Sequence, residues 1–403
     1  MKVLFLGEAK KKHVRDWAAW LMEQGVQVQI LSDNLPASFE HEGQTLNILQ
    51  PQWSFLQNLW TYKIRGGELA NNRDKWKVYL PYIKQFNPDL IHAHEALGYG
   101  PILAYTSKAI PKVLTPWGPD VEDALLHPTT SKGRLVIQAC KSADAIVTNA
   151  NGLEDKWAAG LSIPKSKFHF FTWGVNTAHF KPVSRELRLS HRDQWLLPEE
   201  AVLFFCPRIP RPLYRHDLIL KAWRKFRAGT NAQPAHLLFL TAGDSAPKKW
   251  DKQGIPDFSF IERECSPNEM AQLYQLSTIT LMIPKTDLLA QSLLESLACG
   301  SIPMVNPLIA YKHVLSHHDD PSKAHGIWVE DESVEPNNGP ASDDKLILQL
   351  VKAFHSAMDL SPEKRAQLSA HNAAYAAHHL DEKFCRKQML HVYDCLLCGK
   401  NLE

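Results

Sequence analysis

Two carboxylates stand close together between Pro284 and Val305, and they are the first residues whose types and spacing could do chemistry. Asp287 falls in the loop expected after the apolar run ITLMIP, and Glu295 falls about two turns into the helix expected next. Anions are attracted by the open backbone amides of that helix's first turn, here those of Ala290, Gln291, Ser292 and Leu293. Carboxylates beside open amides suit a ligand that carries hydroxyls and a diphosphate, such as a sugar nucleotide.

Positive charge for such a ligand comes from two arginines earlier in the chain. Arg208 and Arg215 flank a proline-rich loop between an expected strand, AVLFFCPR, and an expected helix. Two arginines beside a helix N-terminus could clamp a pyrophosphate through charge and bidentate hydrogen bonds. Gly243 ends the next strand and permits a ligand to approach the backbone closely.

A second group of candidates follows strands in the first half of the chain. Gly7 comes directly after the strand KVLFL and allows a tight turn beside Lys10, Lys11 and Lys12. His92 and His94 alternate along a strand, so their side chains point the same way, either into a site or into the core. Metal binding by these histidines would need further ligands that the sequence does not supply. The CLLC run at 395–398 has the spacing of half a zinc site, but we interpret it as one face of a helix.

Composition narrows the classes of protein. A chain of 403 residues with 44% apolar and 22% charged residues is typical of a globular protein of two domains. A net charge of +2 argues against a dedicated nucleic-acid binder. The first residues lack a signal-peptide pattern, no apolar run reaches 18 residues, and the seven cysteines fit free thiols, so we expect a cytoplasmic protein.

The elements that must position these residues alternate between strands and helices, and the alternation starts again after residue 200. We therefore predict two doubly wound α/β domains facing across a cleft, with ligands outside the carboxyl ends of the parallel strands. The expected boundaries are 1–182 for the first domain, 183–200 for a linker and 201–375 for the second domain. A C-terminal helical segment, 376–403, is expected to pack back on the first domain.

Several motifs in this order resemble the retaining glycosyltransferases of family 4, which have the GT-B fold. The most specific is DLLAQSLLESLACGSIPMV (287–305), which looks like the family's pair of acids with seven residues between them and the helix and strand that follow. Further support comes from HAH (92–94), from WGVNTAHFKP (173–182) and from the arginine-containing segment 208–217. The resemblance covers nearly the whole chain.

This resemblance implies roles for individual residues. Arg208 and Arg215 would bind the donor diphosphate, and Gly7 would lie at the loop that approaches donor and acceptor. Glu295 would bind the nucleotide ribose. Asp287 would contact the donor sugar, and His94 would sit beside that sugar at the reacting centre.

The sequence departs from the family pattern at four places. Asp287 stands where the family usually has glutamate, and Glu8-Ala9 follow Gly7 where a second glycine is usual. Arg215 replaces a lysine, and His216 replaces a glycine. A divergent enzyme or a catalytically inactive sugar-nucleotide-binding relative would each fit these departures.

The expected reaction moves a hexose from a nucleotide sugar to an acceptor hydroxyl with retention, and it needs no metal because the arginines neutralise the diphosphate. The acceptor could be a glycan, a glycolipid or a lipid-linked saccharide. Peripheral membrane contact could follow from the tryptophans of the first half, Trp17, Trp20, Trp53, Trp60 and Trp76. A non-hydrolysing nucleotide-sugar epimerase is the second enzymatic interpretation, because it shares the two-domain architecture.

Overall fold

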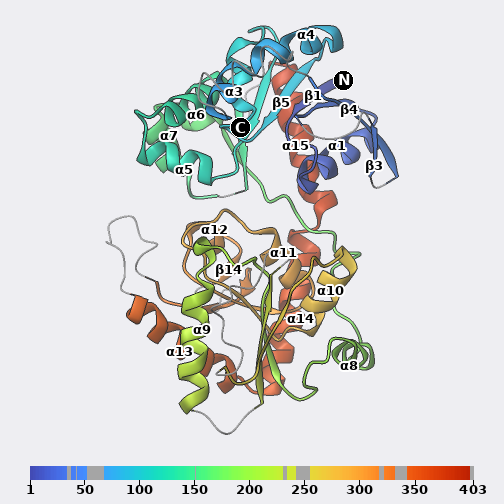
Figure 1. The fold of residues 1–403 in the computed structure, drawn as a ribbon. Helices are drawn as coiled ribbons and strands as arrows, with labels where there is room; N and C mark the ends of the chain where they lie inside the picture. Colours follow the sequence, from blue (N-terminus) through green and yellow to red (C-terminus); the bar gives the residue numbers. More distant parts are fainter. Residues whose placement is uncertain are drawn as a thin grey trace. The chain divides into compact units, whose positions relative to one another are not determined.

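The computed structural model describes residues 1–33, 38–41, 43–51, 68–149, 151–229, 234–241, 255–316, 322–331 and 343–399. The chain divides into two compact units (Figure 1). Unit 1 consists of Met1–Phe171 and Arg386–Glu403, and unit 2 consists of Thr172–Cys385. Each unit is built around its own sheet of mainly parallel strands, which confirms the expected α/β class. Three residues singled out in the sequence lie outside the described residues: Trp53, Trp60 and Gly243.

The sheet of unit 1 has eight strands in the order β3-β4-β2-β1-β5-β6-β7-β8. Every neighbouring pair is parallel except β3 and β4, which form an antiparallel hairpin at the edge. The central strands β1 and β5 are almost completely buried because both faces of the sheet are covered. The strands are β1 (Lys2–Leu6), β2 (Gln27–Leu31), β3 (Ser38–His41), β4 (Gln44–Leu49), β5 (Leu90–His94), β6 (Lys112–Thr115), β7 (Ala145–Thr148) and β8 (Phe168–Phe170).

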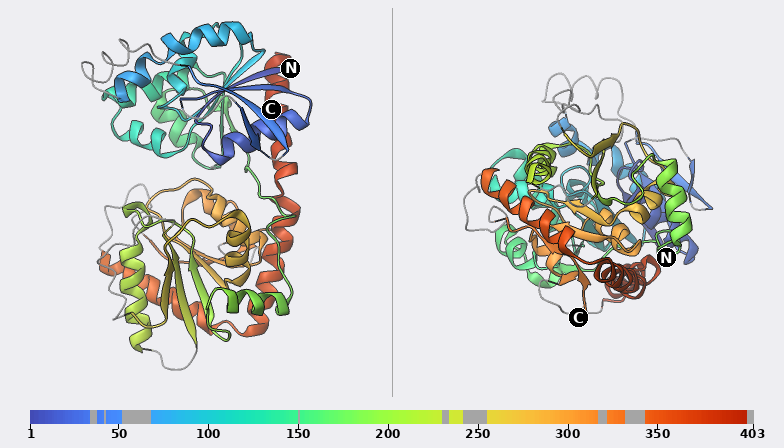
Figure 2. Two further views of the ribbon diagram at one scale, coloured as in Figure 1. Left: turned by 45° about the vertical axis from the view of Figure 1, so that its right-hand side comes forward. Right: turned by 90° about the horizontal axis from the view of Figure 1, so that it is seen from below.

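Helices cover both faces of this sheet. Figures 1 and 2 show α1 and α15 on one side and α4 and α6 on the other. α1 buries Val14, Trp17 and Leu21, which recur at the spacing of one helix face. The helices are α1 (Lys12–Glu23), α3 (Glu68–Asp74), α4 (Trp76–Phe86), η2 (Gly100–Tyr105), α5 (Pro119–Leu126), α6 (Ser131–Ser142), α7 (Glu154–Leu161), η3 (Lys165–Lys167) and α15 (Glu382–Leu397).

The main sheet of unit 2 has six parallel strands in the order β11-β10-β9-β12-β13-β16. A separate two-stranded sheet pairs β14 with β15. The parallel pairing brings the carboxyl ends of the strands to one edge, where ligands of open α/β sheets bind. The strands are β9 (Val202–Cys206), β10 (Ala235–Leu240), β11 (Phe258–Ile261), β12 (Ile279–Met282), β13 (Ile302–Val305), β14 (Leu315–Ser316), β15 (Ala324–His325) and β16 (Ile327–Trp328).

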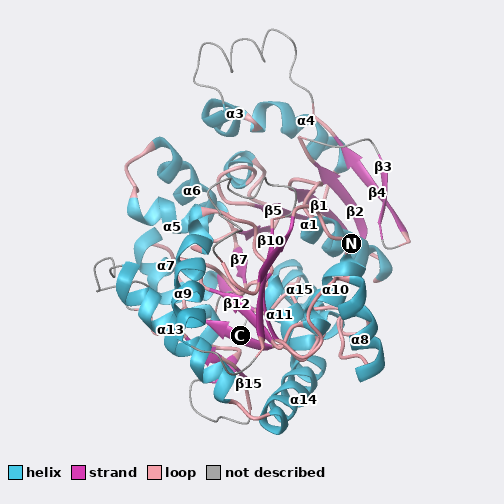
Figure 3. Cartoon of the chain, turned by 60° about the horizontal axis from the view of Figure 1, so that its bottom comes forward, coloured by secondary structure: helices cyan, strands magenta, loops and turns pink. Residues whose placement is uncertain are grey.

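The helices of unit 2 also form two layers. α9 and α13 lie on one face of the sheet, and α10, α11 and α14 lie on the other (Figures 1 and 3). The first layer is held by an aromatic cluster in which Trp223 contacts Phe204, Phe226 and Phe354 at centroid distances of 5.3–5.4 Å. The helices are α8 (Arg185–Gln194), η4 (Pro212–Tyr214), α9 (His216–Gly229), α10 (Pro267–Leu276), α11 (Gln291–Ala298), α12 (Ile309–Lys312), α13 (Asp343–Asp359) and α14 (Pro362–His379).

The segment 183–200, expected to be a linker, differs from that expectation. It contains α8, which Ser184 caps by accepting a hydrogen bond from the Leu187 amide at 3.3 Å. Arg188 donates to the backbone oxygen of Leu276 at 3.1 Å and so docks α8 against the end of α10. The segment is part of unit 2, which begins at Thr172.

The long helical stretch expected over 366–397 is broken into α14 and α15. At the break, the Val175 amide donates to the oxygen of Leu380 at 2.7 Å, and the Glu382 amide donates to the oxygen of Val175 at 3.0 Å. Gly174 makes this approach possible, because its φ is +76° and a Cβ there would meet Glu382 Cα at 2.4 Å. Pairing with a distant segment thus interrupts an otherwise helical sequence.

Candidate functional site

Polar side chains gather where four adjacent strands of unit 2 end. Arg208 follows β9, Asp287 follows β12, Asn306 follows β13 and Asp331 follows β16. These strands are neighbours in the sheet, so their loops meet at its carboxyl edge. The structure therefore brings Arg208 and Asp287 together and adds two polar residues that we had not selected.

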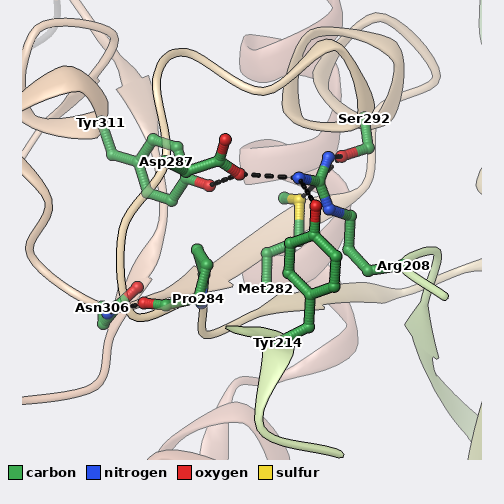
Figure 4. Close-up of polar contacts among 8 residues, drawn as sticks. All are labelled: Arg208, Tyr214, Met282, Pro284, Asp287, Ser292, Asn306 and Tyr311. Carbon is green, nitrogen blue, oxygen red and sulfur yellow. Dashed lines mark hydrogen bonds and ion pairs between the residues drawn. The ribbon is translucent and has the colours of Figure 1, made fainter. Parts of the chain in front are cut away.

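Arg208 is held from three sides (Figure 4). Its Nη2 lies 2.9 Å from Asp287 Oδ2 and 2.7 Å from the Tyr214 hydroxyl. Its Nη1 donates to Ser292 Oγ at 3.4 Å, at the start of α11. The Tyr214 ring also lies 4.3 Å from the guanidinium carbon, within cation–π range. The guanidinium is thus pre-oriented at the helix terminus where we expected a diphosphate.

Asp287 is a partly buried acid that accepts hydrogen bonds from two side chains. Besides Arg208, the Tyr311 hydroxyl donates to its Oδ2 at 3.2 Å. Burial raises the pKa of Asp287 above its ordinary value, and the charge of Arg208 and the Tyr311 hydrogen bond offset only part of that rise. The expected roles place Arg208 and Asp287 at different parts of one ligand, whereas in the structure the two side chains contact each other.

Arg215 interacts with a different acid from the one that binds Arg208. It adopts a left-handed backbone conformation with φ of +55° and forms an ion pair with Asp331. Both side chains are buried, with exposed fractions of 8% and 0%. Asn306 Nδ2 donates to Asp331 Oδ2 at 3.2 Å and to the oxygen of Pro284 at 2.7 Å. The two arginines are therefore balanced by two different acids.

The helix N-terminus is partly open. Ala290 is the N-cap of α11 in an extended conformation, and the Leu293 amide already donates to the oxygen of Ala290 at 3.0 Å. The amides of Gln291 and Ser292 come earlier in the first turn and have no acceptor within the helix. The side chain of Gln291 donates to the oxygen of Gly174 at 3.0 Å. Glu295 lies inside α11 and is half-buried.

His216 supports the backbone of Arg208. Its Nε2 donates to the oxygen of Arg208 at 2.8 Å and lies 3.5 Å from the Cys206 sulfur. Burial lowers the pKa of His216 to about 4, so the ring is neutral near pH 7. His216, which stands where the family has a glycine, therefore stabilises the loop after β9 that carries Arg208.

In unit 1, His92 and His94 lie on the same side of β5, as their alternation predicted. Their rings stack with centroids 4.3 Å apart and planes 24° apart. Burial lowers the pKa of His92 to about 3 and that of His94 well below 6.5, so both rings are neutral near pH 7. Gly7 lies against this pair, because a Cβ there would meet His94 Cβ at 3.3 Å.

The residue after His94 is strained. Glu95 has a φ of +73°, which is uncommon for a side chain other than glycine or asparagine. Burial, with Asp120 nearby, raises its pKa to about 7. Asp120, from the TPWGPD stretch, accepts from the backbone amides of Ala96, Trp117 and Val121 at 2.7–3.1 Å and so orders both loops.

Two of the three described tryptophans that were expected at an acceptor or membrane surface are core residues. Trp17 and Trp20 are buried and pack edge to face at 6.1 Å. Trp76 is half-buried and stacks on Tyr105 at 4.4 Å, so it alone of the described three offers an aromatic face near the surface. No helix among the described residues is long and apolar enough to cross a membrane.

The N-terminal part of the chain is similar to a known protein family. Residues 2–150 match the family model described as glycosyl transferase 4-like. A search of curated protein sequences returned no match. Over these residues the chain is similar to the glycosyl transferase 4-like family.

Solved structures extend the similarity over the whole chain. Sucrose-phosphate synthase from Thermosynechococcus elongatus superimposes with a TM-score of 0.72 at 14% identity, covering 99% of this chain and 100% of that one. HepE from Anabaena, in complex with UDP and glucose, gives 0.70 at 13% identity over 98% and 99%. WaaG, a glycosyltransferase involved in lipopolysaccharide biosynthesis, gives 0.68 at 13% identity over 96% and 98%. The chain thus has the GT-B fold, and the predicted resemblance to family 4-like glycosyltransferases is confirmed.

Some contributors to the site escaped the sequence analysis. Asn306 and Asp331 follow strands, so the same strand-end rule would have found them. Tyr214 and Tyr311 carried no signal, because tyrosines beside loops are common and nothing in the local sequence marks their partners, Arg208 and Asp287. The roles predicted for Arg208, Arg215, Asp287, Glu295 and His94 stay predictions.

Proposed function

We propose that this protein is a retaining glycosyltransferase that moves a hexose from a nucleotide sugar to an acceptor hydroxyl without a metal ion. The observation that carries the proposal is Arg208, pre-oriented by Asp287, Tyr214 and Ser292 at the carboxyl edge of a unit 2 sheet. The family model and the structural neighbours support a glycosyltransferase as the class of enzyme.

The donor is proposed to bind across this edge of unit 2. Arg208 and the first amides of α11 would receive the diphosphate, since a helix N-terminus and a guanidinium both favour phosphate oxygens. Arg215 is proposed to lie behind them on the diphosphate side, with its charge balanced by Asp331. Glu295 would accept hydrogen bonds from the ribose hydroxyls. Asp287 would turn from Arg208 to the sugar hydroxyls as the phosphates take its place.

The proposed chemistry takes place on one face of the sugar. The bond between the anomeric carbon and the diphosphate oxygen breaks, and the acceptor oxygen bonds to the same face of that carbon. The leaving diphosphate receives the proton of the acceptor hydroxyl, and Arg208 stabilises the charge that grows on it. His94, being neutral, would donate or accept one hydrogen bond at the sugar. Gly7, which has no side chain, would leave room for the sugar beside His94.

The acceptor is proposed to be a saccharide or glycolipid bound by unit 1. Support comes from the carboxyl ends of two neighbouring strands, where Gly7 and Glu8 follow β1 and His94 and Glu95 lie at the end of β5. The half-buried stack of Trp76 on Tyr105 could hold a sugar ring nearby. Peripheral membrane contact stays a prediction.

The experiment is a binding and turnover assay with UDP-glucose, chosen because HepE was solved with that molecule. We expect the wild-type protein to melt at a higher temperature with the donor and to hydrolyse it slowly. Glu295→Ala should weaken donor binding about 10- to 100-fold, because hydrogen bonds to a charged group are lost. Other nucleotide sugars are then tried in the same assay.

The matched control is Glu363→Ala, which removes an exposed carboxylate from the first turn of α14. It should leave binding and hydrolysis unchanged. If no nucleotide or nucleotide sugar stabilises the wild type, the donor site does not exist as proposed. Interconversion of two nucleotide sugars without acceptor would instead identify an epimerase, and binding without any turnover would identify an inactive relative.

A further inference from the structure

The imidazole proposed to face the sugar has nothing of its own to fix its orientation. His94 is 1% exposed, and neither ring nitrogen has a hydrogen-bond partner among the described residues. Its ring is held by packing alone, against His92 at 4.3 Å, Phe5 at 5.0 Å and His13 at 6.0 Å. The nearest and most parallel of these neighbours is His92.

His92, in contrast, is fixed at both nitrogens. Its Nδ1 lies 2.5 Å from the hydroxyl of Tyr393, and its Nε2 lies 2.7 Å from Thr115 Oγ1. His92 and Tyr393 are completely buried. The neutral ring carries one N–H, so one of the two hydroxyls accepts from the ring and the other donates to it. These two bonds set the tautomer and the plane of His92.

We infer that Tyr393, on α15, is a positioning residue for His94: it fixes the His92 ring on which the His94 ring stacks. This inference rests on the proposed function, in which His94 lies beside the donor sugar. The last helix of the chain thereby acts on the reacting centre through two stacked rings, although its residues belong to no motif of the site. Loss of the Tyr393 hydroxyl should let both rings turn.

A simpler role for Tyr393 is to anchor α15 to the sheet. Both roles predict some loss of stability for Tyr393→Phe, so stability does not separate them. They differ in what happens to His94. Anchoring alone leaves the His94 ring and the turnover of the folded enzyme unchanged, whereas positioning alters both.

The first measurement uses the full-length protein labelled with ¹⁵N-histidine. We expect Tyr393→Phe to shift or broaden the ring signals of both His92 and His94, which are assigned by substituting each histidine. Thr115→Val, which removes the other anchor of His92, should do the same. Tyr375→Phe removes the same hydroxyl from α14 and should leave both signals in place. Unchanged His94 signals in Tyr393→Phe would overturn the inference.

The second measurement follows kcat and KM for the donor. We expect Tyr393→Phe to lower kcat about 10-fold with KM nearly unchanged, since misplacement of a group at the reacting centre affects mainly the transition state. In a His94→Ala background the same substitution should have no further effect on kcat. Equal effects in both backgrounds would overturn the inference. If the wild type turns over no donor, the proposed function has failed, and the histidine spectra still decide whether Tyr393 positions His94.

Discussion

Arg208 is paired with Asp287, and this pairing sets what each residue can do. A guanidinium that is balanced by a carboxylate 2.9 Å away presents little net charge to an incoming diphosphate. The ligand must therefore displace the acid from the arginine. If the donor binds as proposed, the phosphate takes the place of Asp287 beside Arg208. The Asp287 carboxylate is then released to contact the sugar hydroxyls.

The exchange makes opposite predictions for free nucleotide and for turnover. Asp287→Asn should bind UDP about 3- to 10-fold more tightly, because the competing charge on Arg208 is gone. The same variant should transfer or hydrolyse sugar more slowly, because the carboxylate that would contact the sugar is lost. Calorimetry with UDP and a turnover assay with UDP-glucose measure the two effects. Weaker binding of UDP by Asp287→Asn would contradict the competition between acid and phosphate.

Glu95 predicts a pH dependence of stability. Its pKa is raised from 4.5 to about 7, so between these values the folded protein binds more protons than the unfolded chain. Stability is therefore lost as the pH rises through this window. Glu95→Gln should be more stable than wild type at pH 8, by about 1–2 kcal/mol once solvent screening of the partly exposed group is allowed for, and equal to it at pH 4. Urea unfolding at the two pH values measures this, and a difference of equal size at both would argue against titration of Glu95.

Among the elements, the loops after β9 and β16 are joined by a buried ion pair. Asp331→Asn leaves the Arg215 charge buried without its partner, and we expect unit 2 to lose about 3–5 kcal/mol of stability. Urea unfolding measures the loss. Asp193→Asn changes an exposed acid on α8 and should have little effect. A small effect at Asp331 would mean that Arg215 is already satisfied by other groups.

Elements were predicted well where a local pattern decides them. The alternation of apolar strands and amphipathic helices indicated both sheets, and the strand-end rule selected Arg208, Asp287 and His94. Polar composition misled at 183–200, because α8 is held by its Ser184 cap and by Arg188 and needs few apolar residues. The break before α15 depends on Val175, some 200 residues away, so no local pattern could indicate it.

At the scale of the whole molecule, what the sequence did not reveal are pairings between distant segments. Asp331 neutralises Arg215 and Tyr393 anchors His92 only because the fold brings them together. Local sequence patterns indicate a site only through neighbours in the chain, and the neighbours of these partners are ordinary. The organisation into GT-B domains was predictable, whereas the charge balance at the site was not.

The position of α15 after unit 2 in the chain affects how unit 1 folds during synthesis. Met389, Val392 and Tyr393 are buried in unit 1, yet the ribosome adds them after every residue of unit 2. While unit 2 is being synthesised, the sheet that carries His92 lacks part of its cover and one of its buried hydrogen bonds. Unit 1 therefore begins first and completes its core last, and a nascent chain that stops before Arg386 leaves an apolar face of its first sheet open to chaperones.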